Sequence, residues 1–141
     1  MSLIRISVPG VPQGKGRARI STRGGFARAY TPEKTVAYEG LIALAGQDAM
    51  AGRALVEGPV YLIVTAFFPI PKSWSKKRAN EAGSGLVWHT SKPDGDNVLK
   101  AVGDGLNGIV WKDDSQIAFS KMVKQYGPHP GLDIMVEVLP Q

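Results

Sequence analysis

The sequence predicts a single α+β domain in which a mixed, mostly antiparallel sheet carries its helices on one side. The chain has 141 residues, with 43% hydrophobic and 21% charged side chains, which is ordinary globular composition. Segments with strand and helix periodicity follow one another without internal repeats. A chain of this length builds one hydrophobic core, so we expect one domain over residues 1–141.

Four segments have the pattern of strands. Residues 3–8 alternate apolar and polar side chains, as a half-buried strand does. Residues 57–68 are β-branched and aromatic, which is typical of a well-buried strand. Two further alternating segments, 115–127 and 132–139, flank a short Pro/Gly turn, so we expect them to complete the sheet.

Helices are predicted between these strands. Thr31, Pro32 and Glu33 form a typical helix start, with Thr31 as N-cap, and we expect a helix from about 32 to 51. The apolar side chains near one face of this helix are Val36, Leu41, Leu44, Ala45 and Ala49. Residues 75–83 predict a short polar helix or a mobile segment. A further helix is expected from Asp96, its N-cap, with these side chains at helical spacing: Val98, Val102, Leu106 and Ile109.

Residues 9–30 form a long basic loop in which "RGG" could turn a short hairpin. The segment carries five basic residues and no acidic one, and its charge equals the net charge of +5 of the whole chain. Clustered lysine and arginine favour a polyanionic partner through counterion release. The alternative is a solubilising loop, and composition alone leaves the two interpretations about even.

Several function classes are excluded or disfavoured. The chain has no cysteine, so disulfides, thiolate metal sites and cysteine nucleophiles are ruled out, and the two histidines are isolated, which disfavours zinc. No Walker A loop, EF-hand or GxSxG motif is present. The longest apolar run, residues 60–70, is shorter than the roughly 20 residues of a membrane helix, and no secretory leader is apparent. We expect a soluble, cytoplasmic protein with no membrane partner.

The stretch "KPDGDNVLK", residues 92–100, is the candidate site. If the chain after Pro93 stays extended, Asp94 and Asp96 project to the same side. Lys100 follows one helical turn after Asp96 on the same face. A second acidic pair follows in "WKDDSQ", residues 111–116, and it can reach the first pair only if the chain doubles back beside the helix.

Carboxylates with a lysine suit the hydrolysis of a phosphodiester. Mg²⁺ prefers oxygen ligands and often bridges carboxylates and a substrate phosphate, while a lysine offsets charge developing on that phosphate. Each feature has a plainer interpretation: a turn with a helix cap, a Lys100–Asp104 surface pair, and a solvated acidic loop. Their occurrence together with an acid-free basic loop favours a site between residues 92 and 116.

The stretch "KPDGDNVLKAVGDGLNGIVWKDDSQI", residues 92–117, resembles the signature of the RusA-type Holliday junction resolvases, or crossover junction endodeoxyribonucleases. That signature is P-D-x-D-N-x-x-K, followed by D-x-L and later by D-D-x-Q. "PGVPQGKGRARIS" and "YTPEKTVAYE" near the N-terminus are similar to the start of these proteins, so the resemblance spans nearly the whole chain. Position 95 departs from the pattern, because glycine stands where an aliphatic residue is common.

The resemblance implies a homodimeric endonuclease, often carried by phages and prophages, that nicks two strands symmetrically at a four-way DNA junction during recombination and repair. It implies Mg²⁺ as cofactor, with Mn²⁺ as a substitute. By position in the motif, the metal ligands are Asp94, Asp96 and Asp114, the essential lysine is Lys100, and Asp113 is the less favoured ligand. The residues of the basic loop expected to contact DNA are Lys15, Arg17, Arg19 and Arg28.

Two rival functions remain open at this point. One is a metal-dependent nuclease of the same chemistry for other branched or single-stranded DNA. The other is a non-catalytic DNA-binding protein whose acidic residues serve only as helix caps.

Overall fold

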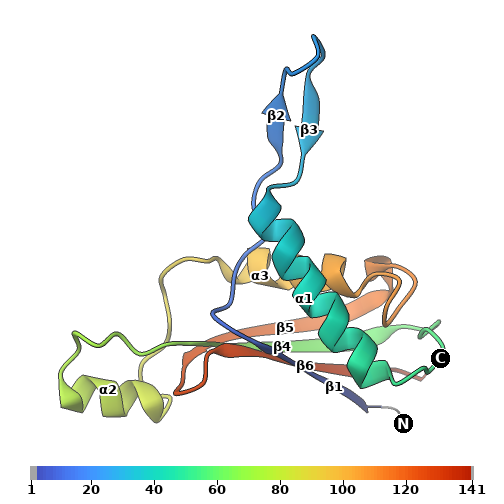
Figure 1. The fold of residues 1–141 in the computed structure, drawn as a ribbon. Helices are drawn as coiled ribbons and strands as arrows, with labels where there is room; N and C mark the ends of the chain where they lie inside the picture. The colour runs from blue at the N-terminus through green and yellow to red at the C-terminus, as the bar shows by residue number, and fades with distance from the viewer. Residues whose placement is uncertain (1–2, 141) are drawn as a thin grey trace.

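The computed structural model describes residues 3–140 and is built on a four-stranded sheet (Figure 1). Its strands lie in the order β1 (Leu3–Pro9), β6 (Gly131–Val138), β4 (Val60–Phe68) and β5 (Ile117–Tyr126). The neighbours β4 and β5 run parallel, and the other two pairs are antiparallel. The predicted mixed sheet of four strands is confirmed, and so is the α+β class.

Three helices are found among the described residues, namely α1 (Glu33–Met50), α2 (Lys76–Gly83) and α3 (Gly95–Leu106). Figure 1 shows α1 and α3 on one side of the sheet and α2 beside its end. The segment 75–83 is therefore a helix rather than a mobile stretch. No helix between residues 3 and 140 is long and apolar enough to cross a membrane.

The core lies between the sheet and the two helices that cover it. Alternate side chains of β1, β4 and β6 are buried toward the helices, as their sequence periodicity predicts. Helix α3 contributes Val98, Val102 and Leu106, all fully buried as predicted. Ile109 lies beyond the end of α3, in a turn, and packs against the core from there, so its placement in the helix was wrong.

The prediction of which face of α1 is buried was wrong for its three largest side chains. Val36, Leu41 and Leu44 are 55%, 50% and 57% exposed. The residues that α1 buries are instead Thr35, Tyr38, Ile42, Gly46 and Met50. The sequence prediction relied on the bulkiest aliphatic residues. Two helices are also stabilised where small residues allow their backbones to pack closely together.

Two glycines set that close approach between α1 and α3. A Cβ atom on Gly46 would lie 2.6 Å from Leu106 Cδ2, and one on Gly105 would lie 2.9 Å from Ile42 Cγ2. Larger residues at either position would separate the helices, so the glycines determine which face of α1 turns inward. The helix itself spans nearly the predicted range, but its N-cap is Pro32 and not Thr31.

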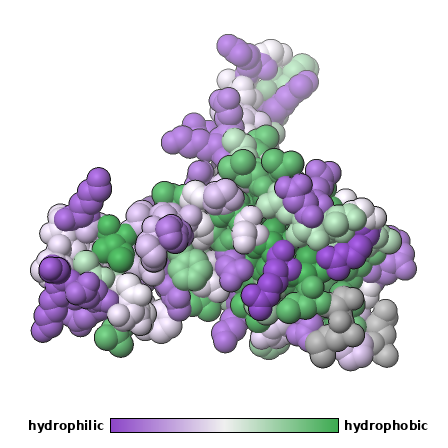
Figure 2. All heavy atoms as spheres, turned by 60° about the horizontal axis from the view of Figure 1, so that its bottom comes forward, coloured by the Kyte–Doolittle hydropathy of each residue, from purple (hydrophilic) through white to green (hydrophobic). Residues whose placement is uncertain are grey.

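The basic loop contains the predicted hairpin, formed by β2 (Arg19–Ser21) and β3 (Arg28–Tyr30). Gly24 and Gly25 in its turn have φ values of +83° and +84°, which glycine adopts without steric cost. Figure 1 shows this basic hairpin projecting from the body of the molecule beyond the N-terminal end of α1. In Figure 2 the hairpin is largely hydrophilic, while hydrophobic side chains gather on the body.

Candidate active site

The first acidic pair lies at the start of α3, but not in the arrangement expected. The N-cap of α3 is Asp94, whose backbone carbonyl accepts from the N–H groups of Asn97 and Val98, each at 3.1 Å. The prediction that Asp96 caps the helix was therefore wrong, and the chain is helical rather than extended from Gly95 onward. The Asp94 side chain makes no capping hydrogen bond, so its carboxylate is not used to start the helix.

Asp96 stands between two hollows in the surface. The first, which we call the lysine hollow, has a volume of about 340 Å³ and is lined by Asp96, Lys100, Gly103 and Asp114, with apolar side chains behind them. The second, the aromatic hollow, has a volume of about 660 Å³, and Asp94 and Asp96 line it together with Trp88, His89, Met122 and Lys124. Asp96 and Lys100 thus share one hollow, as their helical spacing predicts.

The second acidic pair reaches α3 because the chain doubles back. Strand β5 returns beside the helix, so that a Cβ on Gly95 would lie 3.1 Å from Met122 Cγ and one on Gly103 would lie 3.6 Å from Asp114 Oδ2. The Asp114 side chain therefore lies against α3 at Gly103, while the far part of β5 lies under the start of the helix. This return path is the one that the sequence required for the two acidic motifs to meet.

The three carboxylates are spaced along α3 rather than gathered at one point. Gly103, where Asp114 lies, is seven residues beyond Asp96, or about 10 Å of helix rise. Within residues 3–140 no three Asp, Glu, His or Cys side chains are close enough together to hold a metal ion. In this conformation the carboxylates of Asp94, Asp96 and Asp114 form an open row and not a closed metal centre.

The donor set nevertheless has the chemistry that Mg²⁺ requires. Asp94, Asp96 and Asp114 offer only oxygen ligands, and all three are exposed to solvent. Among the described residues, no side-chain hydrogen bond or ion pair occupies these carboxylates. They are free to take a cation, because no competing partner within the described chain has to be displaced.

The two acids of "WKDD" have different roles in the structure. Asp113 caps the short 3₁₀ helix η1 (Asp114–Gln116), where its Oδ2 accepts from the Ser115 N–H at 3.1 Å. Hydrogen bonds from Ser115 lower the pKa of Asp113. Asp114 makes no comparable bond and lines the lysine hollow, and its assignment over Asp113 as metal ligand stays a prediction.

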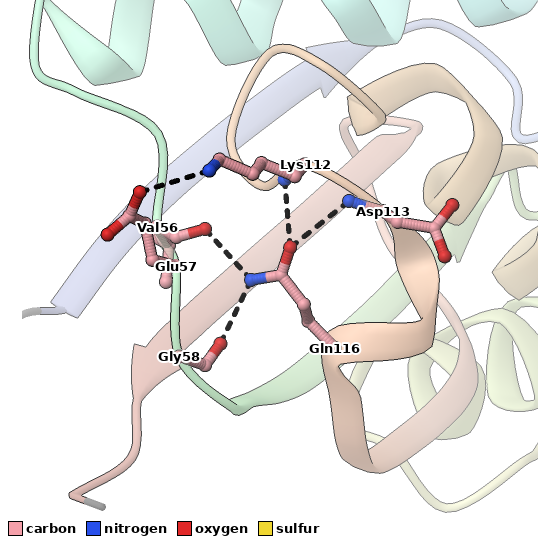
Figure 3. Close-up of polar contacts among 6 residues, drawn as sticks. All are labelled: Val56, Glu57, Gly58, Lys112, Asp113 and Gln116. Carbon is pink, nitrogen blue, oxygen red and sulfur yellow. Dashed lines mark hydrogen bonds and ion pairs between the residues drawn. The ribbon is translucent and has the colours of Figure 1, made fainter.

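The glutamine of the D-D-x-Q pattern is Gln116, and its hydrogen bonds give it a structural role (Figure 3). Its Nε2 donates to the carbonyl oxygens of Val56 and Gly58 at 2.8 and 3.0 Å, while its Oε1 accepts from the backbone N–H groups of Lys112 and Asp113 at 2.9 and 3.1 Å. One side chain therefore ties the acidic turn to the segment that precedes β4. This bracing holds the turn that carries Asp114 in place.

Lys100 makes no ion pair with Asp104, the partner that the plainer interpretation assigned to it. Asp104 instead accepts from Lys15 Nζ at 2.8 Å, and Lys15 also contacts Glu39 of α1 at 3.0 Å. These contacts, the hydrogen bond with Asp104 foremost, raise the pKa of Lys15. No carboxylate within the described part of the chain lies within ion-pair distance of Lys100, so the interpretation of Lys100 as part of a surface pair with Asp104 is wrong.

The residues predicted to contact DNA lie in three places. Lys15 joins the basic loop to α1 and α3, and its backbone N–H also donates to Asn97 O at 2.8 Å. Arg19 and Arg28 lie on one face of the hairpin, because Arg19 pairs with Tyr30 and Arg28 with Ser21, and directly opposed or alternate residues share a face. Arg17 lines a third hollow, which also includes Asp94. Their contact with DNA remains a prediction.

Three residues around the aromatic hollow were missed in the sequence. His89, interpreted as structural or solvated, stacks on Phe68 with ring centroids 3.6 Å apart, and Lys124 Nζ donates to Ser91 O at 2.7 Å. Trp88 beside them is 60% exposed. The alternation of β5, which places Lys124 on the same side as Met122, was the one signal available for Lys124; nothing local distinguishes Trp88 or His89.

The basic loop reaches Asp94, and a row of free carboxylates with a lysine has the chemistry that the class of nucleases uses. Comparison with known families agrees. The model described as "Endodeoxyribonuclease RusA" matches residues 9–137, and the chain belongs to this family. It is also 36% identical over 138 residues to "Uncharacterized protein YqaN" of Bacillus subtilis (strain 168), with 96% of each chain covered. The family resemblance noted in the sequence is confirmed, and the family indicates an endodeoxyribonuclease.

Proposed function

We propose that this chain is a metal-dependent endodeoxyribonuclease that resolves four-way DNA junctions by paired, symmetric hydrolysis, in DNA recombination and repair in the cytoplasm. The proposal is carried by one observation, the lysine hollow. In a chain of the RusA family, Asp96, Lys100 and Asp114 line this hollow, and neither the lysine nor the carboxylates have a competing partner within residues 3–140. A scissile phosphate is the ligand that such a combination of charges would accept.

The chemistry divides among these residues. Mg²⁺, or Mn²⁺ in its place, held by Asp94, Asp96 and Asp114 would supply Lewis-acid activation of the scissile phosphate. Lys100 would hold a phosphate oxygen and offset the negative charge that grows on it as water attacks. Because the carboxylates form an open row, we expect them to draw together when metal and DNA bind. Bracing by Gln116 limits the movement required of Asp114.

The basic hairpin would contact the DNA backbone next to this site. Arg17, Arg19 and Arg28 have no carboxylate partner among the described residues, so their charges are available for phosphates. Such contacts position a nucleic acid without reading its sequence. They suit a substrate that is recognised by its shape, such as a junction.

We further propose that the active form is a homodimer, because a two-fold protein presents two sites to a substrate with two equivalent strands. Support comes from the outward face of α1, where Val36, Leu41 and Leu44 are each at least 50% exposed. Exposed apolar side chains of this size are what a second subunit would cover.

The decisive experiment compares labelled four-way junction, fork, single-stranded and duplex DNA in the presence and absence of Mg²⁺. We expect paired, symmetric nicks in the junction only, and Asp94→Asn, Asp96→Asn and Asp114→Asn variants that bind the junction without cutting it. Asp133→Asn, on β6, is the matched control and should cut normally. Preferential cutting of forks or single strands would establish the rival nuclease, and binding without metal-dependent cutting of any substrate would establish a DNA-binding protein.

A further inference from the structure

The aromatic hollow lies on the other side of Asp94 and Asp96 from Lys100, and the chemistry proposed above makes no use of it. Its volume of about 660 Å³ falls within the roughly 300–1,000 Å³ typical of small-molecule sites. The walls combine an exposed indole, an imidazole, a thioether and an ammonium group, and its rim is formed by two of the candidate metal ligands. The lining residues that matter are Trp88, His89, Asp94, Asp96, Met122 and Lys124.

Three contacts hold the walls of this hollow in place. The His89 ring stacks on Phe68 of β4 at 3.6 Å between centroids, nearly parallel at 7°, and meets Tyr126 of β5 edge-on at 5.2 Å. Lys124 Nζ donates to Ser91 O at 2.7 Å, which ties the segment before α3 to β5. The segment that follows Trp88 is therefore anchored at His89 and at Ser91, and a ligand would find the hollow already formed.

The character of the walls favours a planar ligand. Trp88 remains 60% exposed, although an aromatic side chain of this size gains free energy when it is covered. Burial and the charge of Lys124 lower the pKa of His89, so its ring is neutral at neutral pH and presents an aromatic surface rather than a cation. Flat aromatic walls with a nearby ammonium group are the features on which bases stack in single-stranded nucleic acid sites.

We propose that the aromatic hollow is a nucleobase subsite, which takes the base of a nucleotide next to the scissile phosphate and stacks it against Trp88. This inference rests on the proposed function. Asp96 lines both hollows, and this shared carboxylate selects the occupant, because a group in the aromatic hollow must be attached to the phosphate that Asp96 addresses from the lysine hollow. Only a neighbouring nucleotide of the same strand meets that condition.

The subsite would help the protein to discriminate branched DNA from duplex DNA. In a continuous duplex the base would have to leave its stack, at a cost of a few kcal/mol. At the branch point of an open junction, whose arms are not stacked on one another, the neighbouring bases lack one stacking partner, so their extraction costs less. The hollow would then be filled, and the phosphate aligned, chiefly on branched substrates.

The subsite is tested by combining substitutions in the protein with removal of single bases from the DNA and comparing the cleavage rates. Junctions carrying one abasic nucleotide at successive positions around the cleaved bond are cut by the wild-type protein, Trp88→Ala, Trp88→Phe and Leu86→Ala. Leu86 is the matched control, because it is 71% exposed in the same segment but does not line the hollow. All four proteins are first checked for an unchanged melting temperature.

We expect Trp88→Ala to lower kcat/KM by about tenfold or more, as loss of base stacking does, and Trp88→Phe and Leu86→Ala to stay within about threefold of the wild type. One abasic position should slow the wild type by a similar factor and leave Trp88→Ala no slower than before. Full cleavage by Trp88→Ala would overturn the subsite. The same conclusion would follow if, at every position, the abasic nucleotide slowed Trp88→Ala by the same factor as it slows the wild type.

A binding measurement separates this inference from the proposed function. With 2-aminopurine at the abasic-sensitive position, the wild type should quench its fluorescence on binding and Trp88→Ala should not, while anisotropy reports binding of the whole junction. If junctions are bound and cut but no position shows quenching that depends on Trp88, the subsite alone is wrong. If the wild type neither binds nor cuts junctions, the proposed function fails and the subsite falls with it.

Discussion

The ammonium group of Lys15 lies 2.8 Å from a carboxylate oxygen of Asp104, and this contact joins the basic loop to α3. The same contact removes the carboxylate with which Lys100 could have paired. One ion pair therefore anchors the loop that leads to the hairpin and leaves the candidate catalytic lysine free.

Replacement of Lys15 by Met should loosen the basic loop more than it destabilises the fold. The ion pair is reachable by solvent, so we expect a loss of about 1 kcal/mol or less in the free energy of unfolding, measured by urea denaturation. Junction affinity should fall by a larger factor, because the hairpin loses its anchor. A fall in stability with no change in affinity would show that the anchor is irrelevant to binding.

The pH dependence of the Lys15 contribution follows from its raised pKa. A raised pKa in the folded state means stabilisation that is fully present below 10.5 and is lost as the pH rises through the folded pKa. The stability difference between the wild type and Lys15→Met should therefore be level across neutral pH and vanish in strong alkali. Asp104→Asn is the control, and it should remove most of that difference.

Lys100→Ala should lower kcat by about 10²- to 10³-fold, as loss of one group that stabilises transition-state charge does. Junction binding should change little, because the hairpin arginines supply most of the phosphate contacts in this proposal. The control is Lys112→Ala, which removes an exposed lysine paired with Glu57 outside the hollow. Equal activity of the two variants in single-turnover cleavage would argue against the catalytic role of Lys100.

Substitutions of the two adjacent acids, Asp113 and Asp114, should have different effects. Asp114→Asn should abolish metal-stimulated cleavage and leave the melting temperature unchanged, because its carboxylate has no partner within the described residues. Asp113→Asn should retain cleavage but lower the melting temperature, since its carboxylate caps η1. Because the pKa of Asp113 is lowered on folding, its stabilising effect is fully present above 3.8 and is lost as the pH falls through the lower pKa of the folded state. The opposite assignment of the two phenotypes would make Asp113 the ligand.

Arg19→Ala and Arg28→Ala should each weaken junction binding and reduce the slope of log K against log salt by about 0.9, the value for one lost phosphate contact. Arg5→Ala, on the opposite part of the molecule in β1, should leave the slope unchanged. Fluorescence anisotropy between about 50 and 200 mM salt measures both quantities. An unchanged slope in the hairpin variants would mean that the hairpin does not touch the backbone.

Leu44→Glu should convert a dimer to a monomer, because it places a charge on the outward apolar face of α1. Light scattering reports the mass, and the monomer should give single rather than paired nicks. A dimer that persists in Leu44→Glu would place the interface elsewhere.

The sequence by itself determined the elements and the chemical inventory of the site. Alternation and apolar runs predicted all four strands of the sheet, "RGG" predicted the hairpin, and the motif named Asp94, Asp96, Lys100 and Asp114 as candidates without coordinates. Such features are readable because strand periodicity, turn chemistry and motif spacing depend on neighbours along the chain.

Only the tertiary structure decided how those parts are used. Gly46 and Gly105 turned Ile42, rather than Leu41 or Leu44, toward α3. Gly95, the departure from the family pattern, is packed against Met122, so that a side chain there would press on β5. The freedom of Lys100 and the position of Trp88 beside Asp94 likewise depend on contacts between segments far apart in the chain. Contacts of that kind depend on the shape of both partners at once, and no local pattern contains that information.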